Sequence, residues 1–88
     1  MKDIKHTPGP WRVEKIDRTE ANYEIQFSTD GECIAEFVHN EADAYLIAAA
    51  PALLSLLIHA TEWIEESRGE SGTTKFYKKA INKAITGE

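Results

Sequence analysis

The sequence predicts an α+β fold, in which a three-stranded antiparallel β-meander is followed by a proline-kinked helix pair and a C-terminal helix. Apolar and polar side chains alternate with period two in two runs, as in strands with one buried face, and a third, largely apolar run follows before residue 40. After Asn40 the apolar residues recur at helical spacing, and Pro51 interrupts the longest helical segment. The 88 residues suit one small domain, divided into a meander over 1–40, a helix pair over 41–67 and a last helix over 74–86.

The strands are predicted from the alternation and from the turn residues between the runs. Thr7-Pro8-Gly9-Pro10 disfavours a helix, because proline has no amide hydrogen and restricts the residue before it. The alternation then predicts strands over 11–16 and 23–27, and a third run predicts a strand over 33–38. Asp30-Gly31 precedes the third run and is typical of a tight hairpin turn, where glycine accepts a positive φ. We therefore expect consecutive antiparallel pairing.

Two helices are predicted on either side of Pro51. Asn40 can cap the first through its side-chain oxygen. Proline suits the first position of a helix and disfavours helical dihedral angles in the residue before it, so we expect a break or kink at Ala50-Pro51. The helix after Pro51 carries apolar side chains around more of its surface than one buried stripe needs. Either it is covered on two sides within the monomer, or it contacts another chain.

The last helix is predicted from apolar residues at helical spacing between Phe76 and Ile85. Thr73 or Thr74 is the expected cap, and Gly87 the expected stop. We expect this helix to be a second cover of the core.

Charge and composition disfavour several classes of function. The net charge of −5 opposes long-range attraction to nucleic acid. A single cysteine, Cys33, and an N-terminus unlike a signal peptide predict a location in the cytoplasm. Eleven consecutive apolar residues from Ala44 to Leu54 fall short of the about 20 that a membrane span needs, and acids follow them. We therefore expect no membrane role.

We expect no catalytic residue, no cofactor-binding residue and no metal ligand. The three histidines, His6, His39 and His59, and Cys33 do not stand at the spacing of a zinc site. Cys33 has acidic neighbours, which raise a thiol pKa, and is interpreted as a small core residue. Three acids near the end of the second helix, Glu62, Glu65 and Glu66, are interpreted as one solvated face. The sequence thus predicts a protein that is not an enzyme.

Four lysines lie within nine residues of the last helix: Lys75, Lys78, Lys79 and Lys83. The simpler interpretation is a solvated face opposite the apolar residues. The alternative is a contact with nucleic acid, although no aromatic side chains are interleaved with exposed lysines in the manner of single-strand binders.

Three blocks of the sequence resemble a family of small bacteriophage and prophage proteins. They are Thr7-Pro-Gly-Pro-Trp11, the central Glu41-Ala-Asp-Ala-Tyr-Leu-Ile-Ala-Ala-Ala-Pro-Ala-Leu-Leu54, and the C-terminal residues 80–88. The resemblance implies expression in a bacterial host cell and carries over no catalytic residues. Similar sequences often have charged residues where this chain has Tyr45, Ala52 and Ser55. The helix pair is therefore less polar than the family pattern.

The leading hypothesis is a non-enzymatic phage accessory protein that binds a host protein or sequesters a ligand, for example as an inhibitor of a bacterial defence system. Self-association into a homo-oligomer is a further expectation. Large exposed apolar patches mark interaction sites. The candidate protein-interaction surface consists of Tyr45, Ala52, Ser55, Leu56, Ile58 and Trp63.

Overall fold

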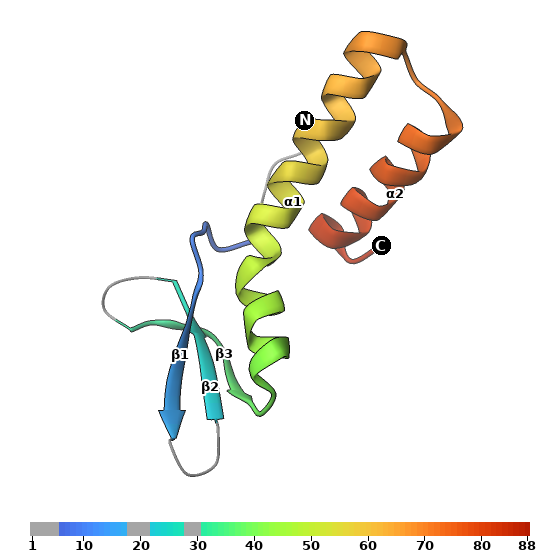
Figure 1. Ribbon diagram of the computed structural model, residues 1–88. Helices are drawn as coiled ribbons and strands as arrows, with labels where there is room; N and C mark the ends of the chain where they lie inside the picture. Colours follow the sequence, from blue (N-terminus) through green and yellow to red (C-terminus); the bar gives the residue numbers. More distant parts are fainter. Residues whose placement is uncertain (1–5, 18–21, 28–30) are drawn as a thin grey trace. The chain divides into compact units, whose positions relative to one another are not determined.

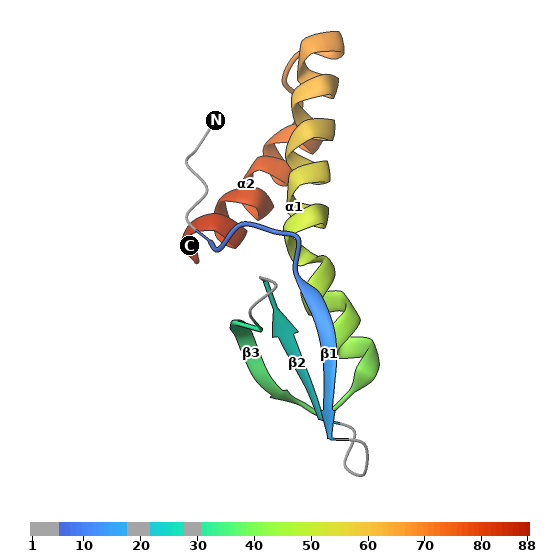
Figure 2. The ribbon, with the colours of Figure 1, turned by 90° about the vertical axis from the view of Figure 1, so that its left-hand side faces the viewer.

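The computed structural model describes residues 6–17, 22–27 and 31–88, and it confirms the α+β fold (Figures 1 and 2). Three strands are followed by two helices: β1 (Arg12–Asp17), β2 (Asn22–Gln26), β3 (Cys33–Val38), α1 (Glu41–Arg68) and α2 (Gly72–Thr86). The strands pair antiparallel in the order β1-β2-β3, as predicted for a meander. Asp30 of the predicted hairpin turn lies outside the described residues, and Gly31 has the positive φ, 83°, that such a turn uses.

The chain divides into two compact units. The first, which we call the sheet unit, spans Thr7–Ala52. The second, which we call the helical unit, is built on Leu53–Glu88. Helix α1 contributes its first turns to the sheet unit and its remaining turns to the helical unit.

The core of the sheet unit lies between the sheet and the first turns of α1. Its buried residues are Tyr23, Ile25 and Ala44, with relative exposures of 5%, 0% and 0%. Partly buried side chains from the strands and α1 pack around them: Trp11, Val13, Ile34, Ala35, Val38, Ile47 and Ala48. The described core residues come from the N-terminal segment, the strands and α1, whereas the last helix was expected to cover this core as well.

Two hydrogen bonds hold the start of α1 in place. The Asn40 side chain accepts a hydrogen bond from the Asp43 amide at 3.0 Å, which confirms the predicted N-cap. The Tyr23 hydroxyl donates to the Glu41 carboxylate at 3.3 Å. Burial of the Tyr23 ring and the nearby Glu41 charge both raise the pKa of Tyr23. The start of α1 is therefore tied to the middle strand.

The predicted division into two helices at Pro51 is wrong, because α1 is one helix of 28 residues with Pro51 inside it. Proline removes one hydrogen bond, here the one to the Ile47 carbonyl, and its ring crowds the preceding turn. The turns before Pro51 are anchored in the sheet core through Ala44 and Ile47. This packing thus holds the turns before the proline in place despite the missing bond.

Helix α2 begins two residues before the predicted position. Its N-cap is Ser71, not Thr73 or Thr74. The Thr74 amide donates to the Ser71 hydroxyl at 3.2 Å, and the Ser71 amide donates to the Thr74 hydroxyl at 2.9 Å. This reciprocal pair is a capping box with threonine in the place of the usual Glu or Gln. Gly87 ends the helix with φ 82°, as predicted.

Candidate functional site

The structure exposes most of the side chains predicted to form an interaction surface on α1. Tyr45, Leu56 and Trp63 are 58%, 66% and 65% exposed, and Ala52 and Ser55 are exposed as well. Tyr45 and Ala52 belong to the sheet unit and the others to the helical unit. Ile58 is the exception in this set.

Ile58 is only 8% exposed, so it does not belong to the candidate surface. It shares a helix face with Thr61 and Glu65, three and seven residues later, and these three side chains line a groove between α1 and α2. The sequence placed Ile58 on a flank of the helix because the position of α2 was not known. Packing against α2 makes that flank an interior face.

The groove in the helical unit has a volume of about 300 Å³. Three isoleucines, Ile58, Ile81 and Ile85, supply its apolar walls, and polar side chains line the rest: Thr61, Glu62, Glu65, Lys78 and Asn82. Ligand pockets usually measure about 300–1,000 Å³, so this groove lies at the lower limit of that range.

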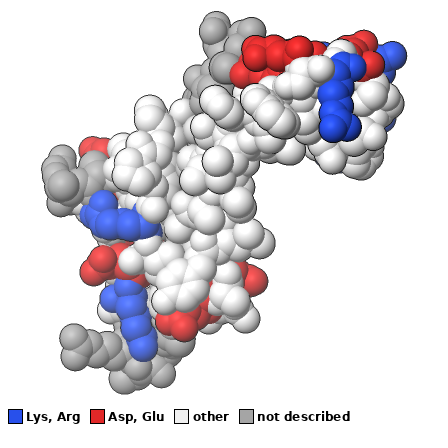
Figure 3. All heavy atoms as spheres, turned by 45° about the horizontal axis from the view of Figure 1, so that its top comes forward, with Lys and Arg blue, Asp and Glu red and all other residues white. Residues whose placement is uncertain are grey.

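The predicted lysine surface is partly neutralised by acids of the same unit. Lys78 contacts Glu65 at 2.8 Å and Glu70 at 2.9 Å, and Lys75 lies 3.8 Å from Glu70. The hydrogen bond from Lys78 lowers the pKa of Glu65, and the two carboxylates raise the pKa of Lys78. On the face shown in Figure 3, Lys and Arg side chains lie beside Asp and Glu side chains, without a continuous basic patch.

Lys79 and Lys83 are the two members of the predicted set that make no ion pair with the described residues. They stand four residues apart and therefore share one face of α2. Two lysines offer far fewer phosphate contacts than typical nucleic-acid-binding proteins make.

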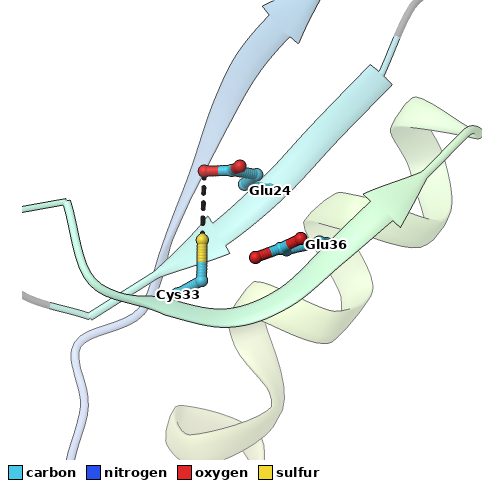
Figure 4. A group of neighbouring side chains, drawn as sticks. All are labelled: Glu24, Cys33 and Glu36. Atoms are coloured by element: carbon cyan, nitrogen blue, oxygen red, sulfur yellow. Dashed lines mark hydrogen bonds between the residues drawn. The ribbon is translucent and has the colours of Figure 1, made fainter.

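Glu24, Cys33 and Glu36 bring their side-chain ligand atoms within 4.8 Å of one another (Figure 4). The Cys33 thiol donates a hydrogen bond to Glu24 Oε1 at 3.0 Å, and Gln26 donates to the same oxygen at 3.0 Å. The bond to Glu24 raises the pKa of Cys33 to about 11, and the same bond lowers the pKa of Glu24. A nucleophile or a metal ligand requires a thiolate, whereas this arrangement stabilises the neutral thiol.

Phe37 is the residue that sequence reasoning missed. Tyr23 pairs with Val38 and Ile25 pairs with Ala35, so two steps along β2 face three steps along β3. The extra residue makes a β-bulge. Phe37 lies there with φ 58°, a left-handed conformation that costs a non-glycine residue about 1–2 kcal/mol, and its side chain is 71% exposed.

A signal for this bulge was present in the sequence. Phe37 and Val38 are adjacent apolar residues, so they depart from the alternation of a strand with one buried face, as Cys33-Ile34-Ala35 also do. Two consecutive apolar residues at the end of a strand require either that both faces are buried or that one residue is displaced by a bulge. The structure shows the second arrangement.

Helix α1 is long and apolar enough to span a membrane, judged by length and composition. An 18-residue window within it has a mean hydropathy of 1.7, and 17% of that window is buried. A core helix of a soluble protein meets the same two criteria. Ala44, Ile47 and Ala48 of α1 pack in the sheet core, so these turns do not expose all their sides to lipid while the sheet unit is folded.

Comparison with known proteins identifies a phage family. Residues 1–88 match the model of the family described as Salmonella phage P22 protein Y8K6. No match was found among curated proteins or among solved structures. The expected relation to small phage proteins is therefore confirmed at the level of the family, and the match extends over both structural units. The chain belongs to the Salmonella phage P22 protein Y8K6 family.

Proposed function

We propose that this protein acts without catalysis, as a phage accessory protein that binds a protein of the bacterial host through Phe37. The supporting observation is the combination of backbone strain and exposure at this residue. Phe37 has φ 58° and is 71% exposed. Residues held in sparsely populated conformations are concentrated at functional sites.

Packing of the Phe37 ring does not offset the backbone strain at this residue. Fully burying a phenylalanine side chain contributes about 1.5–3 kcal/mol, and Phe37 keeps most of its surface in water. Glycine or asparagine adopts φ near 60° with less strain, so stability alone favours another residue at position 37. A contact with a binding partner gives a reason for an aromatic side chain there, because aromatic residues commonly anchor protein interfaces.

The charges around Phe37 indicate the chemistry of the partner. Glu36 is adjacent in sequence and exposed, Glu32 is exposed nearby along the chain, and the whole protein carries −5. Complementary charge steers association and disfavours wrong partners. We infer a partner with an apolar pocket that accepts the ring and a basic rim that faces the acids. A host defence protein with such a pocket is one form of this partner.

The other binding modes have weaker support. Sequestration of a small ligand would use the groove between α1 and α2, which is at the lower limit of ligand-pocket volume. Binding of nucleic acid would use the lysines of α2, of which Lys75 and Lys78 already pair with acids. The described geometry favours Phe37 over either site.

The test is an affinity capture from Salmonella lysate with the wild-type protein and two variants. Phe37→Gly removes the ring and relieves the strain, so loss of binding by this variant is not explained by unfolding. Ile16→Ser is the matched control, because Ile16 is an apolar side chain that is 53% exposed on another strand. We expect one host protein that the wild type and Ile16→Ser both capture and that Phe37→Gly loses.

The captured protein is then purified, and its affinity for each variant is measured by calorimetry. Truncation of an interface anchor costs 2 kcal/mol or more, so we expect Phe37→Gly to weaken binding by at least about 30-fold. Equal affinity of the wild type and Phe37→Gly would contradict the proposal, as would a capture with no specific host protein.

A further inference from the structure

The helical unit leaves four of its large apolar side chains exposed: Leu53, Leu56, Trp63 and Phe76. Among its described residues, Ile58 is the buried hydrophobic side chain, and Thr61 and Thr74 are also buried. By contrast, Leu53 is 51%, Leu56 66% and Trp63 65% exposed. A helix must bury its apolar stripe against another layer of structure to contribute to stability. Leu54, Leu57 and Ile64 of α1 are half-buried, whereas Leu53, Leu56 and Trp63 are not covered by α2.

The exposed apolar residues of α1 in this unit form a stripe with coiled-coil spacing. Leu53, Leu56, Ala60 and Trp63 follow one another at intervals of three, four and three residues, the a and d positions of a heptad. We call these four residues the α1 stripe. All four are exposed. Ile58, by contrast, faces the groove shared with α2, so the intramolecular packing of α1 leaves the stripe uncovered.

We infer that the α1 stripe is a dimer interface, covered by the same stripe of a second copy of this chain running antiparallel. In antiparallel helix pairs an a position faces a d position of the other helix. Leu56 then faces Ala60 of the second copy, a large side chain against a small one, and Leu53 faces Trp63. Each contact occurs twice, as two-fold symmetry requires. The stripe is therefore complementary to itself.

The charges of α1 favour the antiparallel orientation. From Ala44 to Thr61 the helix carries no Asp, Glu, Lys or Arg, whereas two exposed acids follow: Glu62, which also lines the groove, and Glu66. A parallel pair places these acids at the same end of both helices, where like charges repel. The antiparallel pair places them beside the uncharged turn around Leu53 of the second copy. Antiparallel packing also sets the two helix dipoles in opposite directions.

This dimer does not depend on the proposed contact through Phe37, which lies in the sheet unit. One proposal can therefore be wrong while the other is correct. A variant without the Phe37 ring still dimerises, and a variant with a disrupted α1 stripe keeps the strain and exposure of Phe37.

The experiment measures the mass of the full chain by sedimentation equilibrium over the micromolar range. We expect a dimer with twice the monomer mass of 9.9 kDa. Leu56→Lys places a charge in the centre of the stripe and should give a monomer with an unchanged far-UV circular dichroism spectrum. Phe76→Lys is the matched control, because Phe76 is 70% exposed on α2, outside the stripe, and this variant should remain a dimer.

Cysteine cross-linking tests the orientation. Cys33 is the single native cysteine, so Cys33→Ala provides a background without thiols. An equimolar mixture of the Leu56→Cys and Ala60→Cys proteins should form a mixed disulfide, because the antiparallel pair places these positions opposite each other. Predominant homodisulfides would indicate parallel packing and overturn the antiparallel assignment.

Two results would overturn the dimer itself. The first is a wild-type protein that stays monomeric throughout the concentration range. The second is a monomer that floats with phosphatidylcholine–phosphatidylglycerol vesicles and loses this ability in Leu56→Lys, which would assign the α1 stripe to a membrane surface. A dimer that persists in Leu56→Lys would move the interface to another face of the chain.

Discussion

Gly9 packs against Pro51 so closely that a β-carbon on Gly9 would lie 3.3 Å from the Pro51 Cβ. Gly9 belongs to the Thr7–Trp11 block and Pro51 to the central apolar block, the two segments in which the resemblance to phage proteins is clearest. The structure therefore brings the two blocks into contact within the sheet unit. The contact gives Pro51 a packing role, although proline removes a hydrogen bond from the helix.

Gly9→Ala should destabilise the protein. The added methyl group meets a proline ring on a helix, which has little freedom to move, and overpacking of this kind costs about 1–3 kcal/mol. The lower entropy of the unfolded alanine chain offsets about 0.4–1 kcal/mol of this cost. We expect a net loss of about 1 kcal/mol in the free energy of unfolding, measured by urea denaturation. Gly72→Ala is the control: Gly72 begins α2 with open space around it, so this variant should be slightly stabilised.

Phe37→Gly should stabilise the sheet unit even though it removes an aromatic side chain. The left-handed backbone at residue 37 favours glycine, and the ring contributes little burial because it is 71% exposed. The expected gain is about 1 kcal/mol, seen as a higher thermal midpoint. Phe37→Val should lower the midpoint, because a β-branched residue tolerates positive φ poorly. Equal midpoints for glycine and valine would contradict the assignment of strain.

Ser71→Ala should weaken the start of α2. The substitution removes the hydroxyl that accepts a hydrogen bond from the Thr74 amide. Loss of such a cap costs about 1 kcal/mol, which urea unfolding can resolve. Ser67→Ala is the comparison, because Ser67 lies within the last turns of α1 and is exposed, and alanine is the better helix former there. The two serine variants should therefore change stability in opposite directions.

Lys78→Gln should destabilise the helical unit more than Lys79→Gln. Lys78 is held by Glu65 and Glu70, whereas Lys79 makes no ion pair with the described residues. Removing Lys78 leaves the partly buried Glu65 carboxylate without its cation. We expect the difference between the two variants to shrink at high salt, because salt screens partly exposed pairs. Identical urea midpoints at low salt would show that the Lys78 pairs contribute nothing measurable.

The Cys33 thiol should become reactive only at unusually high pH. Its pKa is raised to about 11, from 9.0 in an unstructured chain, mainly by the hydrogen bond to Glu24. The folded state then holds the thiol proton more tightly than the unfolded state. The stability from this bond is fully present below pH 9 and is lost as the pH rises from 9 towards 11.

Alkylation of Cys33 by iodoacetamide measures this pKa directly. The rate should rise with a midpoint near pH 11 in the wild type and nearer to 9 in Glu24→Gln, where the carboxylate that accepts the thiol hydrogen bond is gone. Circular dichroism at each pH confirms that the protein remains folded. A wild-type midpoint near 9 would show that the thiol is not held by Glu24.

Much of the fold was predictable because it depends on local patterns. The three strands, the Asn40 cap and the Gly87 stop follow from alternation, side-chain capping and the conformational freedom of glycine. The division into two helices at Pro51 was predicted wrongly, because local preference favours ending a helix there. Packing on the sheet core and against Gly9 holds the helix together through the proline.

The candidate site was less predictable, since exposure depends on which face each neighbour covers. Leu56 and Trp63 were singled out as apolar residues on the flanks of the predicted helix and are exposed, but Ile58 from the same set is covered in the groove shared with α2. Phe37 was overlooked because a bulge is defined by pairing with another strand, and the third run gives only its adjacent apolar residues as a hint.

Side-chain periodicity, capping residues and sequence blocks are local properties, and they were enough to predict the α+β class, the order of the elements and the relation to phage proteins. The folded arrangement adds three features: α1 is continuous, Cys33 donates to Glu24, and Phe37 is exposed in a strained conformation. Each of these depends on contacts between residues distant in the chain. Such contacts set burial, pKa and backbone strain, and a local pattern does not specify them.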